Sequence, residues 1–366
     1  MTFGRREHPG GVPSPGESTM AATGSAARGL TTTPWRVMLP LAGGLVLGIG
    51  LLFVIRQVAR PLGFLVVAIA IAEALAPVVE RLHARMPRSV AIAGVFATLV
   101  AGFVALAWLV VPMLIAQGQE LLLRAPELVA RVEDLVDLDD TPFNGGLANA
   151  VAATSQRWAG ALLGLPLKIL AAVVDVLVVL FLSVYWLIGA PSLGRFTLSL
   201  LPTERRAHAQ GVLREGGQAM GGYVRGAAIN AVIMGVLAWV GLALIGVKYA
   251  LALGVLTMLA EPVPIIGPIL AAIPVVAIAL LQSPQLAMGA LALYIALQQL
   301  EGQLLTPNIM RSQTDMPQTV VLFAVMAGGA VGGLLGILAS LPLAAALRVL
   351  VLRVLVPAVR RWTGAV

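Results

Sequence analysis

Residues 261 to 274 read Glu-Pro-Val-Pro-Ile-Ile-Gly-Pro-Ile-Leu-Ala-Ala-Ile-Pro and lie in an apolar region, where no further charged residue occurs until Glu301. The stretch begins with a carboxylate that three prolines and a glycine follow closely. A proline has no backbone N–H, and its ring clashes with the carbonyl one turn earlier, so these residues cannot continue a straight helix. The sequence therefore predicts a helix that breaks at Glu261.

A helix break with an acid beside it indicates a functional site in this segment. In hydrocarbon, the freed backbone groups need partners from protein or trapped water. Acids inside a membrane are costly and mark ion or solute pathways, and secondary transporters build their sites at broken helices. We therefore interpret Glu261 as part of a transport site. The alternative is a plain proline kink, with Glu261 facing an aqueous cavity that has no role in transport.

The composition is that of a membrane protein. Of the 366 residues, 59% are hydrophobic and 11% are charged, whereas soluble domains carry about 25% charge. There is no cysteine, and the three histidines lie in hydrophilic stretches, so no disulfide, metal site or cofactor is expected. No catalytic motif is recognisable, so we do not expect an enzyme. The net charge of +7 is explained by membrane orientation rather than by nucleic-acid binding.

The expected fold class is all-α. We predict a polytopic helical membrane protein with about eight spans, one or more broken helices, and an amphipathic helical segment between spans three and four. A span needs about twenty apolar residues. Such runs occur at 37–55, 62–79, 90–116, 169–188, 226–247, 250–281, 286–300 and 320–347. The run 250–281 is too long for one straight helix, and either a broken span or a re-entrant hairpin would fit it.

The remaining segments set the predicted organisation and orientation. Residues 1–34 are expected to be a disordered cytoplasmic tail, 35–116 spans one to three, 117–165 an amphipathic extracytoplasmic segment, 166–189 span four, 190–225 a basic cytoplasmic segment, 226–356 spans five to eight, and 357–366 a cytoplasmic tail. Most of the 24 basic residues then lie inside, as the positive-inside rule requires. Arg56 and Arg60, in a predicted short outer loop, oppose the rule. Both termini are expected in the cytoplasm.

Ordered short motifs fill the C-terminal third of the chain. They are Tyr223-Val-Arg225-Gly226, Gly246-Val-Lys-Tyr249-Ala-Leu-Ala-Leu-Gly254, Pro264-Ile-Ile-Gly267-Pro268 with Pro274, Gln299-Leu-Glu301-Gly302, Leu305-Thr306-Pro307-Asn308-Ile309-Met310, Gly328-Gly-Ala-Val-Gly-Gly-Leu-Leu-Gly336 and Leu341-Pro342-Leu343-Ala344-Ala345. This ordered set resembles the autoinducer-2 exporter family of bacterial multi-pass permeases. The resemblance implies an inner-membrane transporter, named for the export of a small polar signalling molecule. Some relatives are described as sodium/proton antiporters, so the resemblance leaves the substrate open.

The break itself supplies candidate binding groups. These are Glu261, the carbonyls freed by Pro262 and Pro264, and the opening backbone amides of the second half-helix, whose start is marked by Gly267 and Pro268. Carbonyls and a carboxylate suit a cation, whereas helix N-terminal amides favour an anion or a polar oxygen. We expect protonation of Glu261 to be coupled to transport.

A second polar cluster ends the seventh predicted span. Gln298 and Glu301 are three residues apart and share a helix face, which suits the binding of solute hydroxyls. The other members of this candidate set are Gln299, Thr306, Pro307 and Asn308, with Arg311 as a partner for Glu301. An interfacial helix cap, whose polar groups meet water, is the alternative.

Four further polar residues are candidates for a cavity or for coupling. Glu73 and Asp175 are intramembrane acids, and Lys168 lies seven residues before Asp175, so a structural pair is one interpretation. Arg225 and Asn230 are expected to line an inner vestibule, although the arginine could instead snorkel toward the interface.

Small residues indicate a packing surface in the last span. Gly328, Gly332 and Gly336 are spaced by four and form one ridge, which predicts close helix packing or a hinge. A bend is expected at Pro342. We also expect a homo-oligomer.

Three functions remain open at this point. The leading one is a permease that exports a small hydrophilic solute, with protons or sodium as coupling ions. The second is a monovalent cation/proton antiporter. The third, from another class, is a structural oligomeric scaffold or passive pore in the lipid bilayer.

Overall fold

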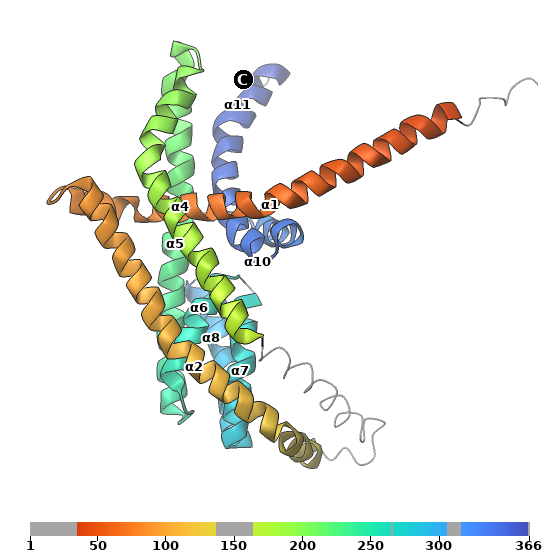
Figure 1. Cartoon of the computed structure of the whole chain (residues 1–366), viewed down its shortest axis with the longest axis vertical. Coiled ribbons are helices and arrows are strands. Elements are labelled where there is room, and N and C mark those ends of the chain that lie inside the picture. Colours follow the sequence, from red (N-terminus) through yellow and green to blue (C-terminus); the bar gives the residue numbers. More distant parts are fainter. Residues whose placement is uncertain (1–34, 137–163, 265, 306–315, 365–366) are drawn as a thin grey trace, which may run out of the picture. The chain divides into compact units, whose positions relative to one another are not determined.

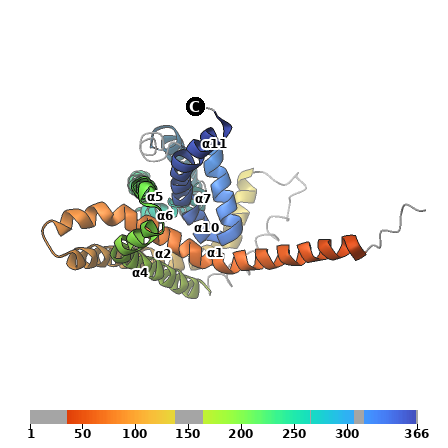
Figure 2. The same cartoon turned by 90° about the horizontal axis from the view of Figure 1, so that it is seen from above.

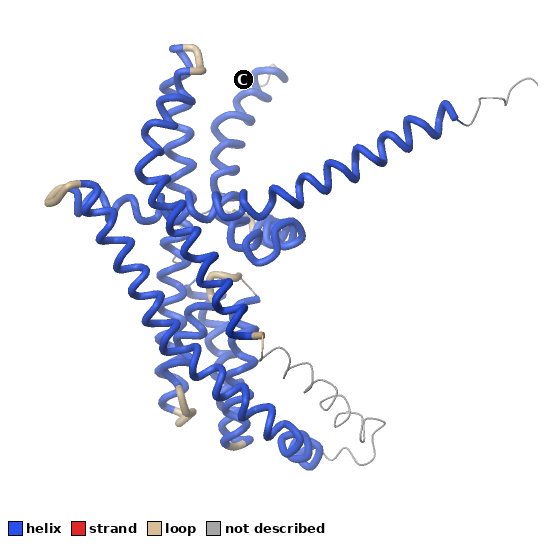
Figure 3. Tube along the Cα trace, viewed as in Figure 1, coloured by secondary structure: helices blue, strands red, loops and turns tan. Residues whose placement is uncertain are grey.

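The computed structural model describes residues 35–136, 164–264, 266–305 and 316–364. These residues form helices joined by short turns and contain no strand (Figure 3). The helices are α1 (Trp35–His83), α2 (Arg88–Val136), α4 (Leu165–Ser199), α5 (Thr203–Leu244), α6 (Ala250–Ala260), α7 (Ile266–Gln282), α8 (Pro284–Leu300), the π-helical η2 (Glu301–Leu305), α10 (Gln318–Leu350), the π-helical η3 (Val351–Leu355) and α11 (Val356–Thr363). The predicted all-α class is confirmed.

The chain divides into two compact units, Met1–Ile55 and Arg56–Val366, and the boundary falls within α1. In the first unit, the described residues are helical from Trp35 onward. The backbone is also helical at Arg56 and Arg60, so the short loop predicted there is wrong. The sequence around Arg56 and Arg60 has no cluster of turn-forming residues, and its single proline, Pro61, does not end the helix.

Helix length and hydropathy identify the membrane-crossing candidates among the described residues. Five stretches are long and apolar enough to cross a bilayer: Gln57–His83, Arg88–Gln117, Leu170–Ser199, Thr203–Ile245 and Thr319–Thr363. Their outer surfaces carry large exposed apolar side chains, such as Trp108 at 81% exposure. Because such a surface is unfavourable in water, it indicates contact with lipid acyl chains. The protein is therefore a polytopic helical membrane protein.

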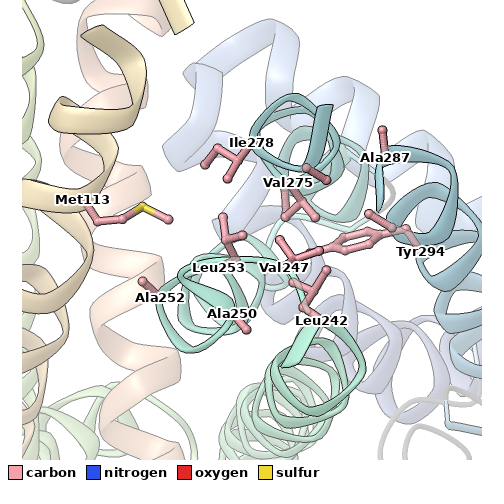
Figure 4. Close-up of a cluster of buried hydrophobic side chains, with 13 residues drawn as sticks. Met113, Leu242, Val247, Ala250, Ala252, Leu253, Val275, Ile278, Ala287 and Tyr294 are labelled. Atoms are coloured by element: carbon pink, nitrogen blue, oxygen red, sulfur yellow. The ribbon is translucent and has the colours of Figure 1, made fainter. Parts of the chain in front are cut away.

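The segment 250–281 forms a hairpin whose arms are too short to span. The backbone N–H of Lys248, just before α6, donates to Oε1 of Gln282 at the end of α7, at 3.1 Å. Leu253 of α6 packs with Val275 and Ile278 of α7 in one buried cluster (Figure 4). At 1.5 Å per residue, the 11 and 17 residues of α6 and α7 reach about 16 and 25 Å, short of a bilayer core of about 30 Å. The break predicted at Glu261 is confirmed, in the form of a hairpin turn.

A second hairpin interrupts α10. Gly333 has φ 59° and ψ −140°, a conformation that essentially only glycine adopts, and the helix folds back there. A Cβ placed on Gly328 would lie 2.3 Å from the carbonyl oxygen of Gly336. In a straight helix, residues eight apart are separated by about 12 Å. The bend is thus at Gly333, and its prediction at Pro342 is wrong, since Pro342 lies inside the second arm.

The three glycines predicted to form one packing ridge do not all lie in a packed interface. Gly328 and Gly336 face each other across the turn and bring the two backbones into contact. Gly332 has no heavy atom within 4 Å of its ideal Cβ position, so it is not part of the packed face.

Replacing Gly333 by alanine should destabilise the second hairpin. The left-handed backbone conformation costs a residue with a Cβ about 1–3 kcal/mol. We expect a clear fall in the midpoint of thermal unfolding, followed by tryptophan fluorescence in detergent. Gly332→Ala is the matched control, because it adds the same methyl group next door in open space. Equal midpoints for the two variants would contradict the hairpin turn at Gly333.

Helix α5 packs against α4, α6, α8 and α10. It lies beside α6 in both views (Figures 1 and 2). Gly235 of α5 and Gly254 of α6 meet backbone to backbone, since a Cβ on Gly254 would be 2.7 Å from the Gly235 carbonyl oxygen. Near its middle, α5 touches α1, because a Cβ on Gly221 would lie 2.5 Å from the carbonyl carbon of Glu73. Small residues thus allow the close approach that helix association in membranes depends on.

Ion pairs between described residues join helices of this unit. Arg60 of α1 binds Asp175 of α4, with Nη2 3.2 Å from Oδ1. Asp175 therefore pairs across a helix interface, and its predicted pairing with Lys168 on the same helix is wrong. Arg353 of η3 makes a two-pronged contact with Glu215 of α5, at 2.8 and 3.0 Å.

Candidate functional site

Glu261 occupies the turn of the first hairpin because the residues after it cannot extend α6. Pro262 cannot donate to the carbonyl four residues earlier, and the chain instead closes a tighter turn, with the Val263 N–H bonded to the Ala260 carbonyl at 3.0 Å. Gly267 lies against the same carbonyl, where a Cβ would overlap the oxygen. The side chain of Glu261 is only 7% exposed. The turn therefore holds a carboxylate inside the protein.

The buried Glu261 side chain meets two polar residues from other helices. Nδ2 of Asn230, in the middle of α5, donates to Oε1 of Glu261 at 2.8 Å and to Oε1 of Glu301 at 3.0 Å. Nε2 of Gln298 donates to the other oxygen of Glu301 at 3.2 Å. We call these four residues the Asn230 carboxylate site.

Glu301 reaches this site because α8 changes its winding there. The regular helix ends at Leu300, and Glu301 opens the π-helical segment η2. Short π-helical segments occur frequently at functional sites, since they redirect side chains out of the regular helical phase. Gln298 and Glu301 do interact, in line with the face predicted from their spacing.

Among the described residues, two buried polar atoms of the site have no hydrogen-bond partner: Oδ1 of Asn230 and Oε2 of Glu261. Leaving such a group unpaired in the interior costs about 1–3 kcal/mol, so orphaned atoms in a native structure call for an explanation. Both atoms are oxygen acceptors: one belongs to the Glu261 carboxyl group, and the other to the Asn230 amide, which contacts the carboxyl groups of Glu261 and Glu301. No ion pair reaches Glu261 or Glu301 from the described residues. A proton or a small cation fits these acceptors.

A further polar pair lies one turn from the site. Thr257 Oγ1 and the Tyr294 hydroxyl are 2.5 Å apart, and both side chains are buried between α6 and α8. Sequence analysis missed this pair. The signal was present, because Thr257 precedes Glu261 by four residues and Tyr294 precedes Glu301 by seven, which places each on the same helix face as its glutamate.

The other predicted site residues lie elsewhere. Gln299 is exposed and accepts a hydrogen bond from Gln303 at 3.1 Å. Asn230, which was grouped with Arg225 at a vestibule, belongs to the carboxylate site instead. Arg225 contacts α1, where its Nη1 donates to the Glu73 carbonyl at 3.1 Å. Thr306, Pro307, Asn308 and Arg311 lie outside the described residues.

Comparison with known proteins identifies the family of the chain. A sequence profile described as AI-2E family transporter matches residues 44–355, most of the chain. The chain belongs to the AI-2E family of transporters. It is 26% identical over 307 residues to YrrI of Bacillus subtilis (strain 168), provisionally named a transport protein, with 80% of this chain and 86% of YrrI covered. It is also 26% identical over 322 residues to PerM of Escherichia coli (strain K12), provisionally named a permease, with 84% of this chain and 90% of PerM covered.

Family membership gives the chain a coarse function. Members of the AI-2E family are membrane transporters, and the relatives above carry names of the same kind. The resemblance seen in the sequence is thereby confirmed. A transport role also gives a reason for a buried Glu261 beside the half-buried Glu301, because intramembrane acids mark ion and solute pathways.

Proposed function

We propose that this protein is a secondary transporter that exports a small hydrophilic solute, such as an autoinducer-2-like signalling molecule, in exchange for protons. The observation that carries the proposal is the shared amide of Asn230, which lies within hydrogen-bond distance of two carboxyl groups. Two carboxylates at such a site repel each other in a low dielectric, and a proton between them removes the repulsion. Proton occupancy then decides how stably the hairpin turn docks on α5.

The coupling follows from this change in charge. With a proton present, one carboxyl group donates to an oxygen acceptor, and the turn at Glu261 remains docked in the interior. Loss of the proton leaves two negative charges beside one amide, which favours hydration of the site and movement of the α6–α7 hairpin. A bistable hairpin of this kind provides the two states that alternating access requires.

A monovalent cation/proton antiporter is the second candidate. The unpaired oxygens of Asn230 and Glu261, together with Glu301, form an all-oxygen donor set. Oxygen donors suit hard cations such as Na⁺, which would replace the proton at the same site. Under this alternative the cation itself is the cargo.

The proposed setting is the inner membrane of a bacterium. The positive-inside rule favours a cytoplasmic position for the α1–α2 turn and the α4–α5 turn, because Arg85, Arg88, Arg205 and Arg206 lie in or beside them. The prediction of two cytoplasmic termini depended on a loop at Arg56 and Arg60, where the structure has a helix. A homo-oligomer in the bilayer stays a prediction, and no nucleic-acid partner is proposed.

Flux measurements in proteoliposomes separate these functions. The full-length protein is reconstituted with an internal pH-sensitive dye, and labelled autoinducer-2 is supplied on one side, with a pH gradient and with choline, Na⁺ or K⁺ as the only external cation. The proposal expects solute movement that depends on the gradient and is accompanied by opposite proton movement. A dye response to Na⁺ or K⁺ alone would establish the antiporter instead. Leak without a gradient would indicate a pore, and no movement a scaffold.

A further inference from the structure

A polar cavity between α1 and α5 is separate in composition from the Asn230 carboxylate site. Its volume is about 750 Å³, and its charged and amide lining consists of Glu73, Glu80, Arg214, Gln218 and Arg225. Sites for small molecules typically occupy about 300–1,000 Å³. The cavity is therefore large enough for a small organic solute.

The geometry of the two helices explains why a space opens there. They touch at Gly221, where the absence of a Cβ lets α5 meet the backbone of Glu73. Gly217 makes room for the Glu73 carboxylate, since a Cβ there would lie 3.0 Å from its Cδ. Beyond this contact, the cavity lies between the following turn of α1 and the preceding turns of α5. The cavity is thus a consequence of one close helix contact.

The two walls of the cavity carry opposite charge. Glu73 and Glu80 are seven residues apart on α1, and Arg214 and Arg225 are eleven apart on α5. At 100° per residue, each pair falls within about 20° of one helix face. The acidic lining residues therefore come from α1, and the arginines and the Gln218 amide come from α5, with the guanidinium of Arg225 reaching across to the α1 backbone.

These four charges do not neutralise one another by direct pairing. The described residues contain no ion pair among them. Arg225 is held on the carbonyls of Glu73 and Ala74, at 3.1 and 3.3 Å, and Oε1 of Glu73 accepts from Nε1 of Trp186 at 3.2 Å. The side chains of Glu80 and Arg214 have no hydrogen bond or ion pair within the described part of the chain. Two charges are thus fixed in place, and two remain available.

We propose that the cavity between α1 and α5 binds a zwitterionic small solute, with its cationic group toward Glu80 on the α1 side and its anionic group toward Arg214 on the α5 side. A wall of each sign favours a neutral molecule with separated charges over a simple anion or cation, each of which would face one repelling wall. In the orientation proposed above, the cavity opens near the cytoplasmic turns, where an exporter loads its cargo. The role of the cavity in loading cargo rests on the proposed function, whereas the binding of a zwitterion to the cavity does not.

Binding to the full-length protein in lipid nanodiscs tests the proposal. Three matched probes are used: L-serine, 3-hydroxypropanoate, which lacks the ammonium group, and ethanolamine, which lacks the carboxylate. We expect serine to bind at least tenfold more tightly than either singly charged analogue, as measured by titration calorimetry. Equal binding of the three, or no serine binding up to about 10 mM, would overturn the proposal.

Variants assign the binding to this cavity. Glu80→Gln and Arg214→Gln should each weaken serine binding at least tenfold, with unchanged thermal unfolding, because both side chains are exposed and neither has a hydrogen bond or ion pair within the described residues. Arg205→Gln, an exposed arginine at the start of the same helix and outside the lining, is the control. An equal effect of all three variants would place the site elsewhere and sink the proposal. Because no gradient is applied, serine binding without coupled flux would reject the proposed function alone, and coupled flux without serine binding would reject this inference alone.

Discussion

Replacement of Glu261 by glutamine should abolish the response of transport to pH while leaving the protein folded. Glutamine has nearly the same shape, and its Oε1 can still accept the hydrogen bond from Asn230 Nδ2, which is 2.8 Å long in the native chain. The new amide cannot gain or lose a proton in the working pH range. Hydrogen bonds to charged groups contribute about 1.5–3 kcal/mol, so loss of the charged state should reduce coupled flux by about tenfold to a hundredfold.

The measurement is initial flux in proteoliposomes over a series of pH gradients. Glu301→Gln should reduce coupling as well, because Glu301 shares the same donor. Glu204→Gln is the control, since Glu204 is an exposed acid in the first turn of α5. If Glu261→Gln keeps the pH dependence of the native protein, the Asn230 carboxylate site is not the coupling site.

The helical class and the break at Glu261 could be predicted because both depend on local chemistry. Long apolar runs need helices in a membrane, and proline removes a donor wherever it occurs. The same reasoning failed at the second hairpin. The stretch from Gly328 to Gly336 contains five glycines, counting both ends, and the sequence does not reveal which one adopts the left-handed conformation. Pro342 was the stronger local signal, yet membrane helices tolerate a proline when neighbouring groups compensate.

Which residues come together in the Asn230 carboxylate site depends on tertiary contacts, and these cannot be predicted from local sequence. Asn230 lies 31 residues before Glu261 and 71 before Glu301. It reaches both only because the α6–α7 segment folds back as a hairpin and α8 ends in a π-helical turn. Asp175 was misassigned for the same reason, since the sequence offers a nearby lysine, whereas the structure provides an arginine on another helix.

Replacement of Gly254 by leucine should strongly destabilise the protein, because it removes the contact that docks the hairpin on α5. A Cβ at this position would lie 2.6 Å from the Trp239 Cβ and 2.7 Å from the Gly235 carbonyl oxygen. The second of these is backbone, which cannot move aside as a flexible side chain can. Overpacking of a closed interface typically costs about 1–3 kcal/mol, and a rigid backbone contact puts this variant at or above the upper end.

The same substitution should also separate the carboxylate site. Gly254 precedes Glu261 by two helical turns, so a helix displaced at Gly254 carries the glutamate away from Asn230. We expect a lower unfolding midpoint in detergent and, in the fraction that folds, loss of pH-coupled flux. Gly102→Leu is the matched control, because it places the same side chain on an exposed face of α2 with nothing within 4 Å. If Gly254→Leu unfolds at the same temperature as this control and keeps coupled flux, then close contact between α5 and α6 is not what assembles the site.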